Sequence, residues 1–133
     1  MTAAVATVTV SPSLIGPDNT QRFQIFYGTM AIGASPLTYT TGGIACDLSG
    51  LGALSQSAPF TVDVKSQQPA GSGNTNQYVY VYLPGTTSVN GLLQIFTGAA
   101  AQTALTELSS GAAIPSGVSG DTITFVAKWI RGI

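Results

Sequence analysis

The chain has 133 residues, enough for one domain that buries most of its unfolded surface in a single core. Only 7% of the residues are Asp, Glu, Lys or Arg, against about 25% in a typical soluble domain, and the net charge is −1. Four dispersed basic residues argue against nucleic acid as a partner, and a chain without histidine cannot build a Ser–His or Cys–His nucleophile.

The N-terminal region, residues 1 to 20, is expected to be either the first strand of the fold or an arm that pairs with a neighbouring subunit. Residues 3 to 10 alternate with the period of two of a half-buried strand, which places Val8 and Val10 on one face. Pro17-Asp18 suits the centre of a β-turn. Because the region lacks a basic n-region and the chain has no apolar run long enough to span a membrane, neither secretion nor membrane insertion is expected.

The remaining residues, 21 to 133, are expected to form one β-sandwich domain. Residues 23 to 29 alternate as in a central strand, and residues 37 to 40 predict a short strand. The pair Gly42-Gly43 supplies the positive φ angles that a tight turn needs. Residues 60 to 65 predict a strand with an apolar inner face and a polar outer face.

Cys46 and Asp47 are assigned structural roles. Cys46 alternates with Ile44 and Leu48, which predicts an inert thiol in the core, and as the single cysteine it forms no disulfide within the chain. Asp47 begins the sequence DLSG and is expected to accept a hydrogen bond in a turn. One cysteine and five dispersed carboxylates do not favour a zinc site, so no metal or other cofactor is expected.

The strand predicted at residues 78 to 83 has two apolar faces. One face carries Tyr78, Tyr80 and Tyr82, and the other carries Val79, Val81 and Leu83. If the aliphatic face packs in the core, the tyrosines form an exposed stripe suited to protein contacts. Alternatively the tyrosines line the core, or both faces are covered. Residues 92 to 97 are expected to complete a hairpin with this strand.

Two further strands are expected toward the C-terminus. Residues 99 to 110 predict a strand, although their Ala, Leu and Glu content also suits a helical turn. The closing strand alternates Ile123, Phe125, Ala127 and Trp129 with other residues. In all, seven to nine short strands separated by turns predict an all-β fold, a single β-sandwich or barrel with jelly-roll-like connections.

Several segments resemble small virion structural proteins of tailed bacteriophages, a group that includes head-decoration or cement proteins. The sequences LTYTTGG at residues 37 to 43 and DLSGLG at residues 47 to 52 are similar to the group's pattern of a tyrosine, two glycines and a D-L-S turn. The tyrosine-rich hairpin at residues 78 to 96 and the closing segment at 121 to 132 are similar as well. The last six residues depart from the group, which ends in small residues, because here they are apolar with two cations.

This resemblance implies a non-enzymatic protein that binds the outer surface of an assembled phage head and bridges its capsomers. The implied partners are the major capsid protein and further copies of the chain, with a trimer favoured over a dimer. The implied location is the virion surface, after synthesis in the host cytoplasm without a signal peptide. Independently, the low charge favours a surface that other proteins cover. The candidate contacts with subunits or capsid are Val8, Val10, Tyr78, Tyr80, Tyr82, Trp129, Ile130 and Ile133.

Other functions stay open at this point. A head fibre, neck or tail component would present the same kind of surface to different virion proteins. A carbohydrate-binding β-sandwich would stack Trp129 and the tyrosines on sugar rings, with the amides of residues 67 to 76 beside them. An enzyme is not expected, because the carboxylates are dispersed and nothing in the sequence pairs them as a glycosidase requires.

Overall fold

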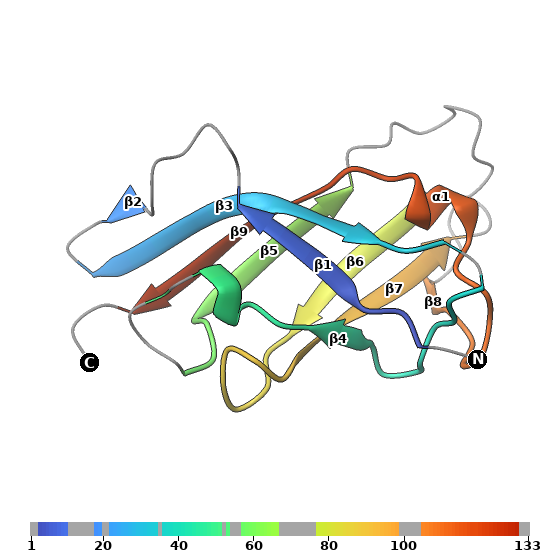
Figure 1. The fold of residues 1–133 in the computed structure, drawn as a ribbon, viewed down its shortest axis with the longest axis horizontal. Helices are drawn as coiled ribbons and strands as arrows, with labels where there is room; N and C mark the ends of the chain where they lie inside the picture. Colours follow the sequence, from blue (N-terminus) through green and yellow to red (C-terminus); the bar gives the residue numbers. More distant parts are fainter. Residues whose placement is uncertain are drawn as a thin grey trace.

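The chain folds as two antiparallel sheets packed face to face, which confirms the expected all-β sandwich (Figure 1). The computed structural model describes residues 3–10, 18–19, 22–34, 36–51, 53, 57–66, 77–98 and 105–130. The elements within them are β1 (Ala6–Val10), β2 (Asp18–Asn19), β3 (Phe23–Ile32), β4 (Ile44–Cys46), η1 (Ser49–Leu51), β5 (Thr61–Ser66), β6 (Gln77–Leu83), β7 (Gly91–Gly98), β8 (Thr106–Glu107), α1 (Ser116–Ser119) and β9 (Ile123–Ile130).

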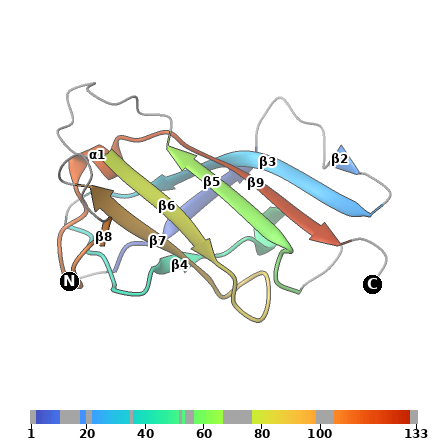
Figure 2. The ribbon, with the colours of Figure 1, turned by 180° about the vertical axis from the view of Figure 1, so that it is seen from behind.

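The first sheet has the strand order β1-β3-β9-β5, with β2 also paired to β3. The second has the order β4-β7-β6, with β8 also paired to β7. Two parallel bridges, Val5 with Ala45 and Ala3 with Thr38, connect the start of the chain to the β4 side of the second sheet. On the other side β5 and β6 lie next to each other in both views (Figures 1 and 2). The sandwich therefore approaches a flattened barrel.

The core forms because large and small side chains alternate across the central strand pair. In the register of β3 and β9, Phe26 lies opposite Ala127 and Gly28 lies opposite Phe125. Each bulky ring thus has space beside it, which allows dense packing in a sheet interior. Trp129 continues the row and is only 1% exposed, and its ring meets that of Phe26 edge to face at 5.5 Å.

The N-terminal region is an edge strand in this structure. β1 pairs with β3 through five consecutive residues, from Ala6 opposite Ile32 to Val10 opposite Gly28. Ala4 and Ala6 are buried, so the small side chains of the alternating pattern face the core. Of the two expected alternatives, the structure therefore has the strand rather than the arm.

Several short elements differ from the sequence-based expectation. Residues 37 to 40 form no strand, because only Thr38 makes isolated bridges, to Ala3 and Ala113. Within 99 to 110 the described residues form only the two-residue β8, and a single turn of helix, α1, interrupts the expected loop before β9. Asp18 pairs with Ile25 as part of β2, and Pro17, the other residue at the centre of the expected turn, lies outside the described residues. The amide-rich loop at residues 67 to 76 lies outside the described residues.

The turn at Gly42-Gly43 has the expected conformation. Both glycines adopt positive φ, 97° and 125°, and the Gly43 N–H donates to the Thr40 carbonyl at 3.0 Å. A Cβ at Gly43 would stand 2.8 Å from the Leu92 Cβ, so this glycine is required by both backbone conformation and space.

Candidate functional site

The tyrosines of β6 face the core, which makes the expected exposed stripe wrong. Tyr80 and Tyr82 are 4% and 8% exposed, and Tyr78 is half-buried against the core. Val79 and Val81, on the other side of the strand, are each 40% exposed. The sequence predicted the alternation and left open which face is buried, because both faces are apolar; the structure buries the tyrosine face, whose larger rings gain more free energy from burial.

The other predicted contact residues lie in different environments. Trp129 is a core residue whose Nε1–H donates to the Ser57 carbonyl at 3.0 Å, so it is not available to a capsid or a sugar. Ile130, the next residue, is 41% exposed and remains a candidate. Val8 is half-buried on β1. Ile133 and the side chain of Val10 lie outside the described residues.

The structure reveals instead an apolar face on the outside of the second sheet. We define the apolar face as the outward side chains of β6 and β7, namely Val79, Val81, Leu83, Leu92 and Phe96. Strand pairing places them in rows, with Leu83 opposite Leu92 and Val79 opposite Phe96. The only polar side chain between these rows is the uncharged Gln94, opposite Val81.

The nearest ionised side chain in this register is at the sheet edge and already has partners. Glu107 lies opposite Phe96. Its Oε1 accepts hydrogen bonds from the Tyr39 hydroxyl at 2.6 Å and from the Gly42 N–H at 2.7 Å. The apolar face is therefore a contiguous hydrophobic surface, the kind that soluble proteins keep small unless it binds something.

The outer face of the first sheet has a different chemistry. Its outward side chains form rows across β3, β9 and β5: one row holds Tyr27, Val126 and Asp63, and the next holds Thr29, Thr124 and Lys65. A third row adds Ile25, Lys128 and Thr61. Although charged residues are scarce in this chain, three of them lie on this face.

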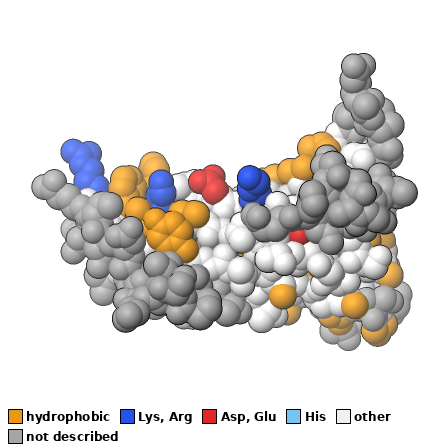
Figure 3. All heavy atoms as spheres, turned by 90° about the horizontal axis from the view of Figure 1, so that it is seen from above, with side chains coloured by type: hydrophobic (Ala, Val, Ile, Leu, Met, Phe, Trp, Pro, Cys, Tyr) orange, Lys and Arg blue, Asp and Glu red, His pale blue; other side chains and the backbone are white. Residues whose placement is uncertain are grey.

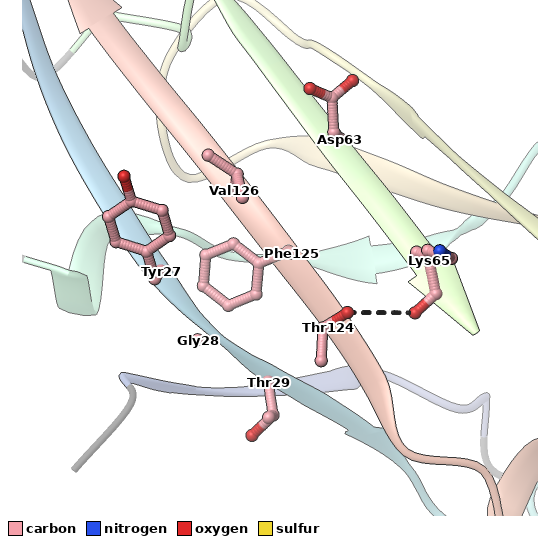
Figure 4. A pocket seen from close by; sticks show the side chains of 8 residues that line it. All are labelled: Tyr27, Gly28, Thr29, Asp63, Lys65, Thr124, Phe125 and Val126. Atoms are coloured by element: carbon pink, nitrogen blue, oxygen red, sulfur yellow. Dashed lines mark hydrogen bonds between the residues drawn. The ribbon is translucent and has the colours of Figure 1, made fainter. Parts of the chain in front are cut away.

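A cavity of about 420 Å³ opens over this face. We refer to it as the hollow, and its lining includes Tyr27, Asp63, Lys65 and Val126. Figure 4 shows its lining, with the Tyr27 ring beside Val126 on one side and the Asp63 and Lys65 side chains on the other. The molecule curves inward along one margin in Figure 3, where charged and hydrophobic side chains are interspersed. Asp63 and Lys65 are exposed on this face, and Lys128 is half-buried.

Two further carboxylates, Asp47 and Asp121, have structural partners. Asp47 accepts the Ser49 N–H at 2.8 Å through Oδ1, which confirms its expected role in a turn. Hydrogen bonds from the Ser49 side chain and, second, from its backbone N–H lower the pKa of Asp47. Asp121 is buried, and its Oδ2 accepts from Ser66 at 2.5 Å and from Tyr80 at 2.8 Å. It thus ties the end of β5 to β6 where the two sheets adjoin. Within the described ranges, no group of three potential ligands could hold a metal ion.

Cys46 is buried and free, as the alternation predicts. Burial, followed by the nearby Asp47 charge, raises the pKa of its thiol to about 12. The thiolate is the reactive form of cysteine, so this side chain is chemically inert at neutral pH.

No helix in the described part of the chain is long and apolar enough to cross a membrane. Comparison with protein-family models, with curated proteins and with solved structures finds no match to this chain. The two sheets thus present unlike outer faces, one apolar and one with a hollow lined by charged side chains.

Proposed function

We propose that this chain is a structural virion protein, a decoration or cement protein that binds the outer surface of a phage head and bridges its capsomers. The observation that carries the proposal is the apolar face on β6 and β7, where Val79, Val81, Leu83 and Leu92 are 37–40% exposed and the strand register places only the uncharged Gln94 among them. Such a surface gains free energy when another protein covers it, at about 25 cal/mol for each Å² of apolar area buried.

The rest of the chain agrees with a role in a symmetric assembly. A protein with 7% charged residues has little electrostatic repulsion between copies, so many copies can pack closely on a lattice. Modest contacts repeated by symmetry then hold firmly through avidity rather than through one strong site. The resemblance of the Gly42-Gly43 segment and the hairpin to virion proteins supports the phage context.

The docking surface in this proposal differs from the one expected from sequence. Tyr80, Tyr82 and Trp129 contribute to the core and hold the sandwich together, whereas the contact residues come from the opposite side of the same hairpin. The major capsid protein and further copies of this chain are the proposed partners, and no reacting group or cofactor is needed.

Sedimentation with phage heads tests the proposal. Heads of the phage that encodes the chain, assembled without it, are mixed with purified protein and pelleted. We expect the protein to co-sediment and to saturate at a fixed number of copies per capsomer. Val81→Lys, which places a charge in the middle of the apolar face, should weaken binding at least tenfold, because a buried unpaired ammonium costs more than 1.4 kcal/mol.

The matched control is Thr7→Lys, an exposed position on β1 away from the apolar face. It adds the same charge and should bind heads as the unchanged protein does. Binding to purified tails or necks but not to heads would move the protein to another part of the virion. Binding to neither particle would refute a structural role in it.

A further inference from the structure

The hollow over the first sheet has the composition of a small-ligand site. Its volume of about 420 Å³ is within the range of about 300–1,000 Å³ that ligand pockets occupy. Two strand spacings separate Tyr27 from Asp63, about 10 Å, and successive rows on one face lie about 7 Å apart. The floor between two rows is therefore about the size of one hexose ring.

We propose that the hollow binds a neutral saccharide, with one sugar ring over Val126 and beside the Tyr27 ring. A pyranose has apolar C–H faces and a rim of hydroxyls, and the hollow offers both kinds of contact. Val126 and the ring of Tyr27 form its apolar side, and the Asp63 carboxylate and Lys65 ammonium provide an acceptor and a donor on the opposite side (Figure 4). Tyrosine suits such a site because its ring is apolar and its hydroxyl is polar.

The charges of the hollow favour a neutral ligand. Asp63 and Lys65 both lie on β5, on the same face, and their opposite charges cancel over the hollow. An ionic ligand would be attracted by one of these two groups and repelled by the other, so it would gain little net electrostatic energy from the pair. Hydroxyl groups, by contrast, can donate to the first side chain and accept from the second, so a polyhydroxylated ligand satisfies both.

The side chains around Asp63 and Lys65 leave both charged groups accessible. Lys128, in the row on the other side of Asp63, is half-buried, whereas Asp63 and Lys65 are both exposed. Thr124 is oriented by its own backbone contact, since its hydroxyl donates to the Lys65 carbonyl at 3.5 Å. The carboxylate and the ammonium therefore remain open to a ligand on their shared face.

This site is independent of head binding. The hollow is on the first sheet and the apolar face is on the second, so a protein docked through the apolar face can still present the hollow. Its saccharide would come from a surface glycan that the particle meets. Failure of either proposal leaves the other standing, because separate residues carry them.

Titration of ¹⁵N-labelled protein with defined oligosaccharides tests the inference. The neutral probes are maltohexaose, cellohexaose, chitohexaose and mannohexaose, and the charged probes are hexagalacturonate and chitosan hexamer. We expect at least one neutral probe at millimolar concentration to shift the amide resonances of residues 27–29, 63–65 and 124–126. No shift with any neutral probe, shifts at other positions, or tighter binding of a charged probe would each overturn the inference.

Substitutions locate the binding energy. Tyr27→Ala should weaken saccharide binding at least tenfold, and Asp63→Asn, which keeps the shape but removes the charge, should weaken it about threefold to tenfold. Phe60→Ala is the matched aromatic control, because Phe60 is 62% exposed on the same sheet but does not line the hollow. Equal affinity of the Tyr27 and Phe60 variants would contradict the assignment. If Tyr27→Ala fails to fold, the exposed Asp63→Asn variant decides the test alone.

Discussion

Glu107 shows how one polar residue can connect three segments of this chain. Its Oε1 accepts from the hydroxyl of Tyr39, which is 1% exposed, and from the N–H of Gly42 in the turn. The same tyrosine oxygen accepts the Ile95 N–H at 3.3 Å. The sequence could not have predicted this network, because Glu107 and Tyr39 are 68 residues apart and nothing in the LTYTTGG segment that contains Tyr39 points to Glu107 as its partner.

Removing the Glu107 carboxylate should destabilise the fold. Glu107→Ala leaves the buried Tyr39 hydroxyl and the Gly42 N–H without this acceptor, and we expect a loss of about 2–3 kcal/mol in the free energy of unfolding. Glu107→Gln retains an acceptor and should lose about 1 kcal/mol. Urea titration followed by tryptophan fluorescence measures both. Asp63→Ala, an exposed carboxylate on β5, is the control and should change stability by less than about 0.5 kcal/mol; equal losses for the Glu107 and Asp63 variants would argue against the network.

The buried acids of the core should make the protein sensitive to alkali. Burial, assisted by the Glu107 hydrogen bond, raises the pKa of Tyr39 from 10.0 to about 12, and burial raises that of the Cys46 thiol from 9.0 to about 12. The unfolded chain therefore releases these protons at lower pH than the folded chain. Their contribution to stability is complete below about pH 9 and is lost as the pH rises toward 12.

Urea midpoints measured from pH 7 to pH 11 check this dependence. We expect a constant midpoint up to about pH 8.5 and a steady fall above pH 9. In the double variant Tyr39→Phe with Cys46→Ala, the midpoint should start lower but fall less steeply, since two of the titrating groups are gone. Parallel curves for the two proteins would show that other groups control the alkaline transition.

At the scale of single elements, the sequence predicted strands well where one face is clearly more apolar than the other. The strand β9 follows the alternation of Phe125 and Trp129 with less buried neighbours, and it was expected. The strand β3 was also expected, but its buried face carries Phe26 while Ile25 and Tyr27 lie on the other face, so the sequence predicted its period and not its orientation. On β6 both faces are apolar, so the sequence pattern predicted a strand but not which of its two faces is buried. The hydrogen bond from Tyr80 to Asp121 and the space beside Gly91 fix the orientation, and both depend on residues distant in sequence.

Gly91 should be intolerant of a side chain for this reason. A Cβ there would stand 2.0 Å from the Tyr82 hydroxyl oxygen, so Gly91→Ala should lower the free energy of unfolding by about 2–3 kcal/mol. Adding Tyr82→Leu shortens the side chain and should recover part of the loss, giving a favourable coupling in the double-mutant cycle. Gly50→Ala is the matched control, because no atom lies within 4 Å of its Cβ position and its φ is not positive. Strict additivity of the two changes would contradict the proposed contact.

At the scale of the whole molecule, the few charged residues are distributed unevenly between the outer faces of the two sheets. The outward side chains of β6 and β7 that form the apolar face are uncharged, whereas Asp63, Lys65 and Lys128 gather on the outer face of the first sheet. The low charge content predicted a surface that other proteins cover. It could not predict where the few charged residues lie, because which residues share a face depends on strand pairing across the chain. The candidate site therefore emerged from the register of β3, β9 and β5 rather than from any local motif.

The N-terminal residues also have a role that involves the whole fold. β1 covers the edge of β3, and the bridges of Ala3 and Val5 to Thr38 and Ala45 connect the two sheets. Deleting residues 1 to 10 should therefore remove an integral strand, uncover part of the core and leave the edge of β3 open to pairing with other chains. We expect a loss of cooperative unfolding and the appearance of large species in light scattering. An arm that only reaches to a neighbouring subunit would give the opposite result: the truncated chain would unfold cooperatively, with an unchanged midpoint, and would lose only its association with other subunits.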